Sequence, residues 1–172
     1  MWPVSQNILD IDRDCERLRR GRYGVIEARG GETCRIRLRC CPKLISYPEV
    51  WLQRVTHRWG SQADRCLLYY NQPRRFPQFL AVTAMKTGRG TSLATVRSVL
   101  QTLDEVAWLK QVDALLCDIG NQRISDRLLA REGWVPHAPS RWHRNFIKRF
   151  PLQQMTHVIP SARACEEEFA LA

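Results

Sequence analysis

The chain lacks any long hydrophobic run. No stretch of its 172 residues approaches the roughly 20 apolar residues of a membrane-spanning helix. The N-terminal Met1–Val4 has neither the basic start nor the apolar run of a signal peptide. We therefore expect a cytoplasmic protein with no membrane partner, in which a single domain over 21–150 follows an N-terminal extension over 1–20 and precedes a flexible tail over 151–172.

Metal-site and disulfide spacings are also missing. The seven cysteines are an odd number, include no C-x-x-C pair and have no histidine at ligand spacing. The sequence therefore predicts neither a disulfide framework nor a zinc site. We expect no metal, and reduced cysteines that pack as small apolar side chains.

Lysine is scarce, whereas arginine is abundant. The chain has 27 Lys+Arg against 17 Asp+Glu, a formal net charge of +10, and 23 of the 27 cations are arginines. This balance favours an anionic partner such as nucleic acid, a phosphorylated cofactor or an acidic surface, without choosing among them. A general preference for arginine on a solvated surface is the alternative explanation.

Two strand patterns flank a glycine pair near the N-terminus. Segments 22–28 and 33–40 surround Gly30-Gly31, which predicts a β-hairpin. The second segment alternates strictly between arginine and small or apolar residues. One face of this strand should therefore carry the row Arg35, Arg37 and Arg39, and the other Cys34, Ile36, Leu38 and Cys40.

Further elements are predicted around this hairpin. The N-terminal segment 10–20 has a helical pattern, and Pro48 suits the first turn of a helix that would extend to about residue 59. Segment 65–70 is apolar and of strand length, and 141–150 alternates enough to form a closing strand. The sequence thus predicts a mixture of helices and strands.

The strongest pattern runs from residue 79 to residue 134. The apolar segment 79–85 is followed by the loop 86–90, and Thr91 or Ser92 is suited to cap a helix. The apolar residues of that helix recur at helical spacing: Leu93, Val96, Val99, Leu100, Leu103 and Val106. A second apolar strand over 114–119 follows, so the two strands should lie parallel. A glycine loop that enters a helix also suits a phosphate.

This order of features resembles the GNAT superfamily of acyl-CoA-dependent N-acyltransferases. The family's pyrophosphate loop reads Gln/Arg-x-x-Gly-x-Gly/Ala. Arg89-Gly-Thr-Ser92-Leu-Ala94 matches its first and last positions but has Ser92 where the family prefers glycine. Downstream, Asn121, a helix over 123–132 and Gly133-Trp134 resemble the family's asparagine, helix and Gly-aromatic pair.

The resemblance implies an α/β (α+β) fold with a mixed, twisted sheet of about six to seven strands and helices on both faces. GNAT proteins usually place one or two helices between their first and second strands. Here the clear helix follows the second strand, so the N-terminal half departs from the family pattern.

A GNAT protein holds acyl-CoA where its fourth and fifth strands splay apart, with the pyrophosphate at the next helix start. The resemblance therefore implies acetyl-CoA or another acyl-CoA as co-substrate. The implied binding residues are Val82, Thr83, Ala84 and Met85 for the pantetheine, Arg89, Gly90, Thr91 and Ser92 for the pyrophosphate, and Asn121. A solvated loop arginine is the alternative role for Arg89, and a helix N-cap that for Asn121.

Catalytic groups are less evident. Many GNAT enzymes place a tyrosine acid four positions before the Gly-aromatic pair, where this chain has Leu129. The remaining candidates for acid or base are His143, Asp118 and Glu27, of which histidine has the best suited ordinary pKa. A surface position for His143 and an ion-paired or capping Asp118 are the alternatives.

We therefore expect an acyl-CoA-binding N-acetyltransferase-like protein that acts on an unidentified amine, and leave its oligomeric state open. One alternative is a catalytically silent GNAT-like domain that binds a partner or effector. The other is a basic nucleic-acid or ribosome-associated module. Its surface would comprise the row Arg35, Arg37 and Arg39 and the basic-aromatic segment 141–150.

Overall fold

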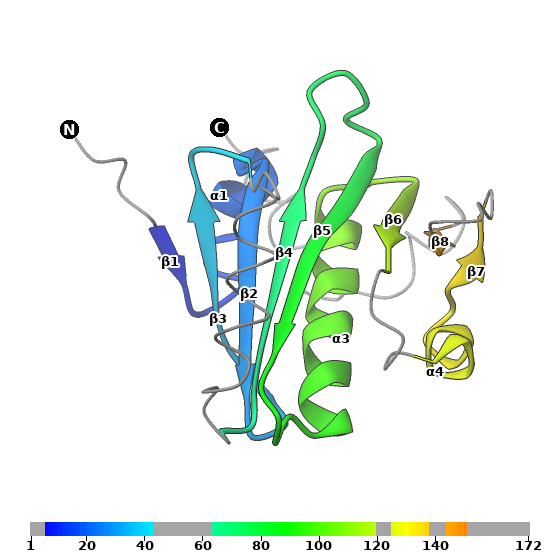
Figure 1. Cartoon of the computed structure of the whole chain (residues 1–172). Coiled ribbons are helices and arrows are strands. Elements are labelled where there is room, and N and C mark those ends of the chain that lie inside the picture. The colour runs from blue at the N-terminus through cyan, green and yellow to red at the C-terminus, as the bar shows by residue number, and fades with distance from the viewer. Residues whose placement is uncertain (1–5, 43–62, 120–124, 138–143, 151–172) are drawn as a thin grey trace, which may run out of the picture.

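The computed structural model describes residues 6–42, 63–119, 125–137 and 144–150 (Figure 1). They form a mixed eight-stranded sheet in the order β1-β3-β2-β4-β5-β6-β8-β7, which confirms the α/β class with one strand more than expected. The strands are β1 (Gln6–Ile8), β2 (Tyr23–Arg29), β3 (Glu32–Arg39), β4 (Arg65–Asn71), β5 (Phe79–Thr87), β6 (Ala114–Asp118), β7 (Val135–Pro136) and β8 (Asn145–Arg149). The helices are α1 (Cys15–Arg20), α3 (Leu93–Leu109) and α4 (Asp126–Arg131). The helix expected near 48–59 lies outside the described residues.

The predicted hairpin is confirmed. Strands β2 and β3 pair antiparallel, and Gly30 and Gly31 between them have φ angles of +58° and +91°, which favour glycine. Ile36 and Leu38 of β3 are buried, and the arginine row occupies the opposite face. Cys34 is an extra residue at a β-bulge, because Arg35 pairs with Glu27 and Thr33 with Ala28, and Cys40 follows the last residue of β3; both cysteines are exposed rather than buried.

The N-terminal segment contributes to the core. Strand β1 pairs with β3, and Ile8 and Leu18 are among the fully buried side chains. The helix expected from residue 10 begins only at Cys15. The carboxylate of Asp10 accepts a hydrogen bond from the backbone N–H of Asp12 at 3.0 Å, which stabilises a turn in place of the first helical residues.

Helix α3 covers one face of the sheet (Figure 1). Its buried side chains include Val99, Leu103 and Val106, and it contacts β2, β3 and β4. Ser92 rather than Thr91 is the N-cap, and its hydroxyl accepts from the N–H of Thr95 at 3.2 Å. The long helix predicted after the glycine loop is therefore confirmed.

The C-terminal elements complete the sheet. Helix α4 begins at Asp126 with Ser125 as N-cap, later than the start expected at residue 123. Trp134 is buried after Gly133, whose φ of +81° ends the helix. Strand β8 pairs antiparallel with β6, and its Lys148 donates to Asp104 of α3 at 2.6 Å.

The six cysteines of the described residues fall into three groups. Burial raises the pKa of the Cys66 and Cys117 thiols to about 12, so both are protonated packing groups, as expected. Cys34, Cys40 and Cys41 are free and exposed. Cys15 is disulfide-bonded, contrary to the expectation that the cysteines are reduced, because spacing along a sequence does not reveal which thiols meet in space.

Candidate functional site

Strand β6 ends beside the first half of β5. Their parallel register starts at the Phe79–Ala114 pair and stops at the Val82–Cys117 pair, whereas pairing of β5 with β4 continues to Thr87. Figure 1 shows β5 extending past the short β6 toward the start of α3. The second half of β5 therefore has no β6 partner, whereas the splay of the two strands that the family resemblance implies stays a prediction.

A β-bulge lies on β5 where its pairing with β6 ends. Ala84 pairs with Tyr69 and Val82 with Tyr70, so Thr83 is an extra residue on β5. Its hydroxyl donates to the backbone oxygen of Tyr69 at 3.4 Å. Bulges bend the strand that carries them, so we expect β5 to bend where its pairing with β6 ends.

The four residues expected along the pantetheine are all half-buried. Val82 and Met85 pack against the hydrophobic core, so their side chains support the strand from within. A ligand along this part of β5 would therefore meet its backbone edge more than these two side chains.

The loop after β5 is fastened to the first residue of β4. The N–H of Gly88 donates to the backbone oxygen of Arg65 at 3.3 Å, and the hydroxyl of Thr91 donates to the same oxygen at 2.8 Å. Arg89 and Gly90 are exposed between these two attachments. Arg89 and Gly90, which the family resemblance assigns to the pyrophosphate, therefore follow the half of β5 that has no β6 partner.

A carboxylate of the chain itself occupies the start of α3. The N–H of Ser92 donates to Asp64 Oδ1 and its hydroxyl donates to Asp64 Oδ2, both at 2.9 Å. The hydrogen bond from the Ser92 backbone is the main cause that holds the pKa of Asp64 below its usual value. Asp64 therefore uses donors that a pyrophosphate would need. Sequence patterns could not predict this contact, because it joins residues 28 positions apart.

Two of the catalytic candidates, Asp118 on β6 and Glu27 on β2, lie in the described residues and are separated by β4 and β5. Asp118 ends β6, one residue past the last pair with β5, and is exposed. Leu129, at the position of the family's tyrosine, is buried in the core. His143 and Asn121 lie outside the described residues.

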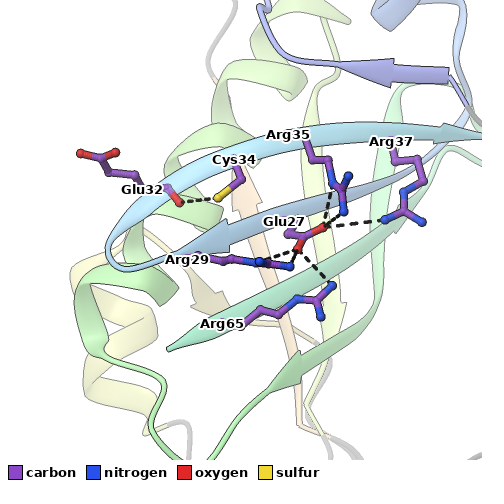
Figure 2. Close-up of polar contacts among 7 residues, drawn as sticks. All are labelled: Glu27, Arg29, Glu32, Cys34, Arg35, Arg37 and Arg65. Carbon is purple, nitrogen blue, oxygen red and sulfur yellow. Dashed lines mark hydrogen bonds and ion pairs between the residues drawn. The ribbon is translucent and has the colours of Figure 1, made fainter. Parts of the chain in front are cut away.

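Glu27 is surrounded by arginines from three neighbouring strands (Figure 2). Its two oxygens accept from Arg29 Nη2 at 2.8 Å and Arg35 Nε at 2.9 Å. Arg65 Nη2 lies at 3.0 Å and Arg37 Nη2 at 3.7 Å. Strand pairing explains the cluster, since Glu27 lies opposite Arg35 on β3 and Arg29 lies opposite Arg65 on β4.

These contacts keep Glu27 ionised. Burial by itself raises the pKa of the carboxyl, but hydrogen bonds from Arg35 and Arg29 and the positive charges of Arg65 and Arg35 outweigh it and lower the pKa. A carboxylate with a lowered pKa is a poor proton acceptor at neutral pH. Glu27, a candidate base from the sequence, is therefore placed to organise arginines rather than to transfer protons.

We call Arg29, Arg35, Arg37, Arg39 and Arg65 the arginine face. The sequence predicted the row on β3 but missed Arg29 and Arg65, which join it only through strand pairing. Three guanidinium nitrogens are buried without a hydrogen-bond acceptor among the described residues: Arg37 Nε, Arg39 Nη1 and Arg65 Nε. The ring of Tyr69 lies 5.8 Å from the Arg39 guanidinium and 5.6 Å from Lys86 Nζ.

A cavity of about 560 Å³ lies elsewhere, between β1, β3 and α3. Thr33, Ser98 and Thr102 line it, and the hydroxyl of Thr33 is 2.7 Å from that of Thr102. Glu105 also lines it, and burial is the main cause that raises the pKa of this carboxyl. None of the predicted cofactor residues lines this cavity.

The described residues offer neither a metal-binding cluster nor a membrane-spanning helix. Among the described parts of the chain, no group of three or more His, Cys, Asp or Glu side chains could hold a metal. No helix in the same ranges is long and apolar enough to cross a membrane.

Comparison with known proteins adds no assignment. No protein-family model matches the chain, and a search of curated proteins gives no significant match.

Proposed function

We propose that this protein binds an acyl-CoA and transfers the acyl group to an amine, as its resemblance to the GNAT superfamily implies. The observation that carries the proposal is that pairing with β6 ends at Val82, next to the bulge at Thr83, while β5 continues to Thr87. The backbone edge of residues 83–87 is therefore without β6, and it leads to the loop before α3. An extended ligand with amide groups, such as pantetheine, can pair with a strand edge of this kind.

The phosphate end of the cofactor would lie near Arg89 and Gly90. Both are exposed, and the positive end of the α3 dipole follows them. The carboxylate of Asp64 repels a phosphate at this position and already accepts from Ser92. Binding therefore requires the phosphate to share or displace these donors, and we expect the affinity to be weaker than an unoccupied loop would give.

Acyl transfer needs a deprotonated amine, whose nitrogen attacks the thioester carbonyl carbon. The new C–N bond forms as the C–S bond breaks, and the leaving thiolate takes up a proton. Asp118 and His143 remain the candidates for these proton transfers. Because Leu129 replaces the family's tyrosine acid, we expect slow turnover that rises with pH as the amine loses its proton.

Calorimetric titration with acetyl-CoA and with acetyl-pantetheine, which lacks the phosphates, tests the binding step. Arg89→Ala should weaken acetyl-CoA by about tenfold, the effect of losing one exposed charge-assisted hydrogen bond, and leave acetyl-pantetheine unchanged. Asp64→Asn should strengthen acetyl-CoA alone, because the amide oxygen can still accept from Ser92 without a negative charge. Arg74→Ala, in the exposed turn before β5, controls for net charge.

The outcome separates three cases. No binding of either ligand at about millimolar concentration, a free energy weaker than about −4 kcal/mol, would overturn the proposal. Equal losses in Arg89→Ala and Arg74→Ala would assign the effect to overall charge. Binding without transfer to a broad panel of amines would favour the silent GNAT-like domain.

A further inference from the structure

The arginine face holds more positive charge than its own carboxylate can balance. Four guanidinium groups surround Glu27, which is the carboxylate that they pair with in the described parts of the chain. Arg39 makes no ion pair there and lies over the ring of Tyr69. The side chains of the four paired arginines are 35% to 55% exposed, so solvent and ligands can reach them.

The shape of the face suits a polymer better than a small anion. Successive residues on one side of a strand lie about 6.5–7 Å apart, so the row from Arg35 to Arg39 spans about 13 Å. Arg29 and Arg65 extend the charge across β2 and β4. Arg35 also lines the cavity between β1, β3 and α3. The charges are therefore spread over three strands rather than gathered around one point.

We propose that the arginine face binds the phosphodiester backbone of a single-stranded nucleic acid. Arginine presents a planar fork of donors that matches phosphate oxygens. Glu27 holds the inner edges of Arg29, Arg35 and Arg65, which lowers the conformational entropy lost when their outer edges bind phosphates. This surface acts independently of acyl-CoA.

The aromatic side chain on this face also supports a nucleic-acid strand. Tyr69 lies beside Arg39 and Lys86 on the same face, and aromatic rings set among cations are typical of surfaces that bind single strands.

Fluorescence anisotropy with a labelled oligonucleotide of about 20 nucleotides tests the proposal, over salt concentrations from about 50 to 200 mM. The plot of log K for binding against log salt has a negative slope. The variant Arg35→Ser/Arg37→Ser/Arg39→Ser should make this slope shallower by about 2, because each phosphate contact contributes about 0.7 for single strands. The control Arg13→Ser/Arg17→Ser/Arg20→Ser removes the same charge around α1, which packs on α3 away from the arginine face. It should leave the slope unchanged.

Equal slopes in the two triple variants, or no binding of the wild-type protein at about 50 mM salt, would overturn the proposal. Stronger binding to a duplex than to the single strand would also overturn it, as would displacement of the strand by micromolar tripolyphosphate, which would indicate a small-anion site. Thermal melts check that the triple variant folds. If it does not, Arg39→Ala serves instead, since Arg39 has no ion pair with Glu27 in the described structure, and it should lower the slope by about 0.7.

Discussion

Glu27 and Asp64 each bind groups that could otherwise bind an external anion, but the remaining charge differs between the two places. Glu27 is buried and contacts four guanidinium groups, so the cluster keeps a large positive excess. Asp64 meets the first backbone N–H and the N-cap hydroxyl of α3, whose partial positive charge is about half a unit. One carboxylate organises a cationic surface, whereas the other neutralises a helix terminus.

A favourable motif must be weighed against the charges that folding brings beside it. The loop before α3 has the local sequence of a phosphate site, but Asp64 competes for it. The arginine row has no motif at all, yet strand pairing enlarges it from three arginines to five. Variants of Glu27 and Asp64 should therefore show whether each carboxylate orders the cationic groups beside it or competes with a ligand for them.

The largest effect should follow from Glu27→Gln. A buried ion pair that loses one partner typically costs about 3–5 kcal/mol, and we expect about 2–3 kcal/mol here because the guanidinium groups are partly screened by solvent. The remaining arginines would also repel one another. Urea unfolding at pH 7 measures the change in the free energy of unfolding.

Glu16→Gln on α1 is the matched control. Its carboxylate pairs with Arg19 and Arg20 on the surface, so the loss should stay within about 1 kcal/mol. A Glu27→Gln variant no less stable than this control would contradict the organising role of Glu27.

A second, smaller effect should appear in acid. The pKa of Glu27 is lower in the folded chain than its ordinary value of 4.5, so its ionised form stabilises the fold above pH 4.5, and this stabilisation is lost as the pH falls through the folded pKa. The difference in unfolding free energy between wild type and Glu27→Gln should therefore shrink between about pH 5 and pH 3. A series of urea titrations measures it. A constant difference across that range would show that the variant acts through packing rather than charge.

The local parts of the fold were predictable, and the cross-chain contacts were not. The hairpin at Gly30-Gly31, the α3 helix and the parallel β5–β6 pair follow from turn chemistry and periodicity, which short segments carry by themselves. The late start of α4 was missed because Ser125 competes with Asn121 as a cap, and a sequence pattern does not rank them.

The candidate sites also combine local features, which the sequence predicted, with contacts between distant residues, which it did not. The glycine loop and the row on β3 are local features and were anticipated. The contact between Asp64 and Ser92 and the enclosure of Glu27 by Arg65 depend on the order of strands in the sheet. That order arises from tertiary packing, so residue spacing alone could not reveal which carboxylate meets which donor.

The smallest effects should come from Ser92, where stability and phosphate binding can be separated. Ser92→Ala removes the hydroxyl that accepts from Thr95 and donates to Asp64, and an N-cap loss of this kind typically costs about 1 kcal/mol. Ser92→Gly should cost only a few tenths of a kcal/mol, because glycine is tolerated at an N-cap. It also introduces the residue that the GNAT pyrophosphate loop prefers and lets a phosphate approach the backbone more closely.

Urea unfolding and acetyl-CoA titration of both variants should therefore give a clearly less stable fold for Ser92→Ala and tighter cofactor binding for Ser92→Gly alone. Tighter binding in neither variant would mean that Asp64, rather than the bulk of Ser92, limits access of phosphate to the start of α3.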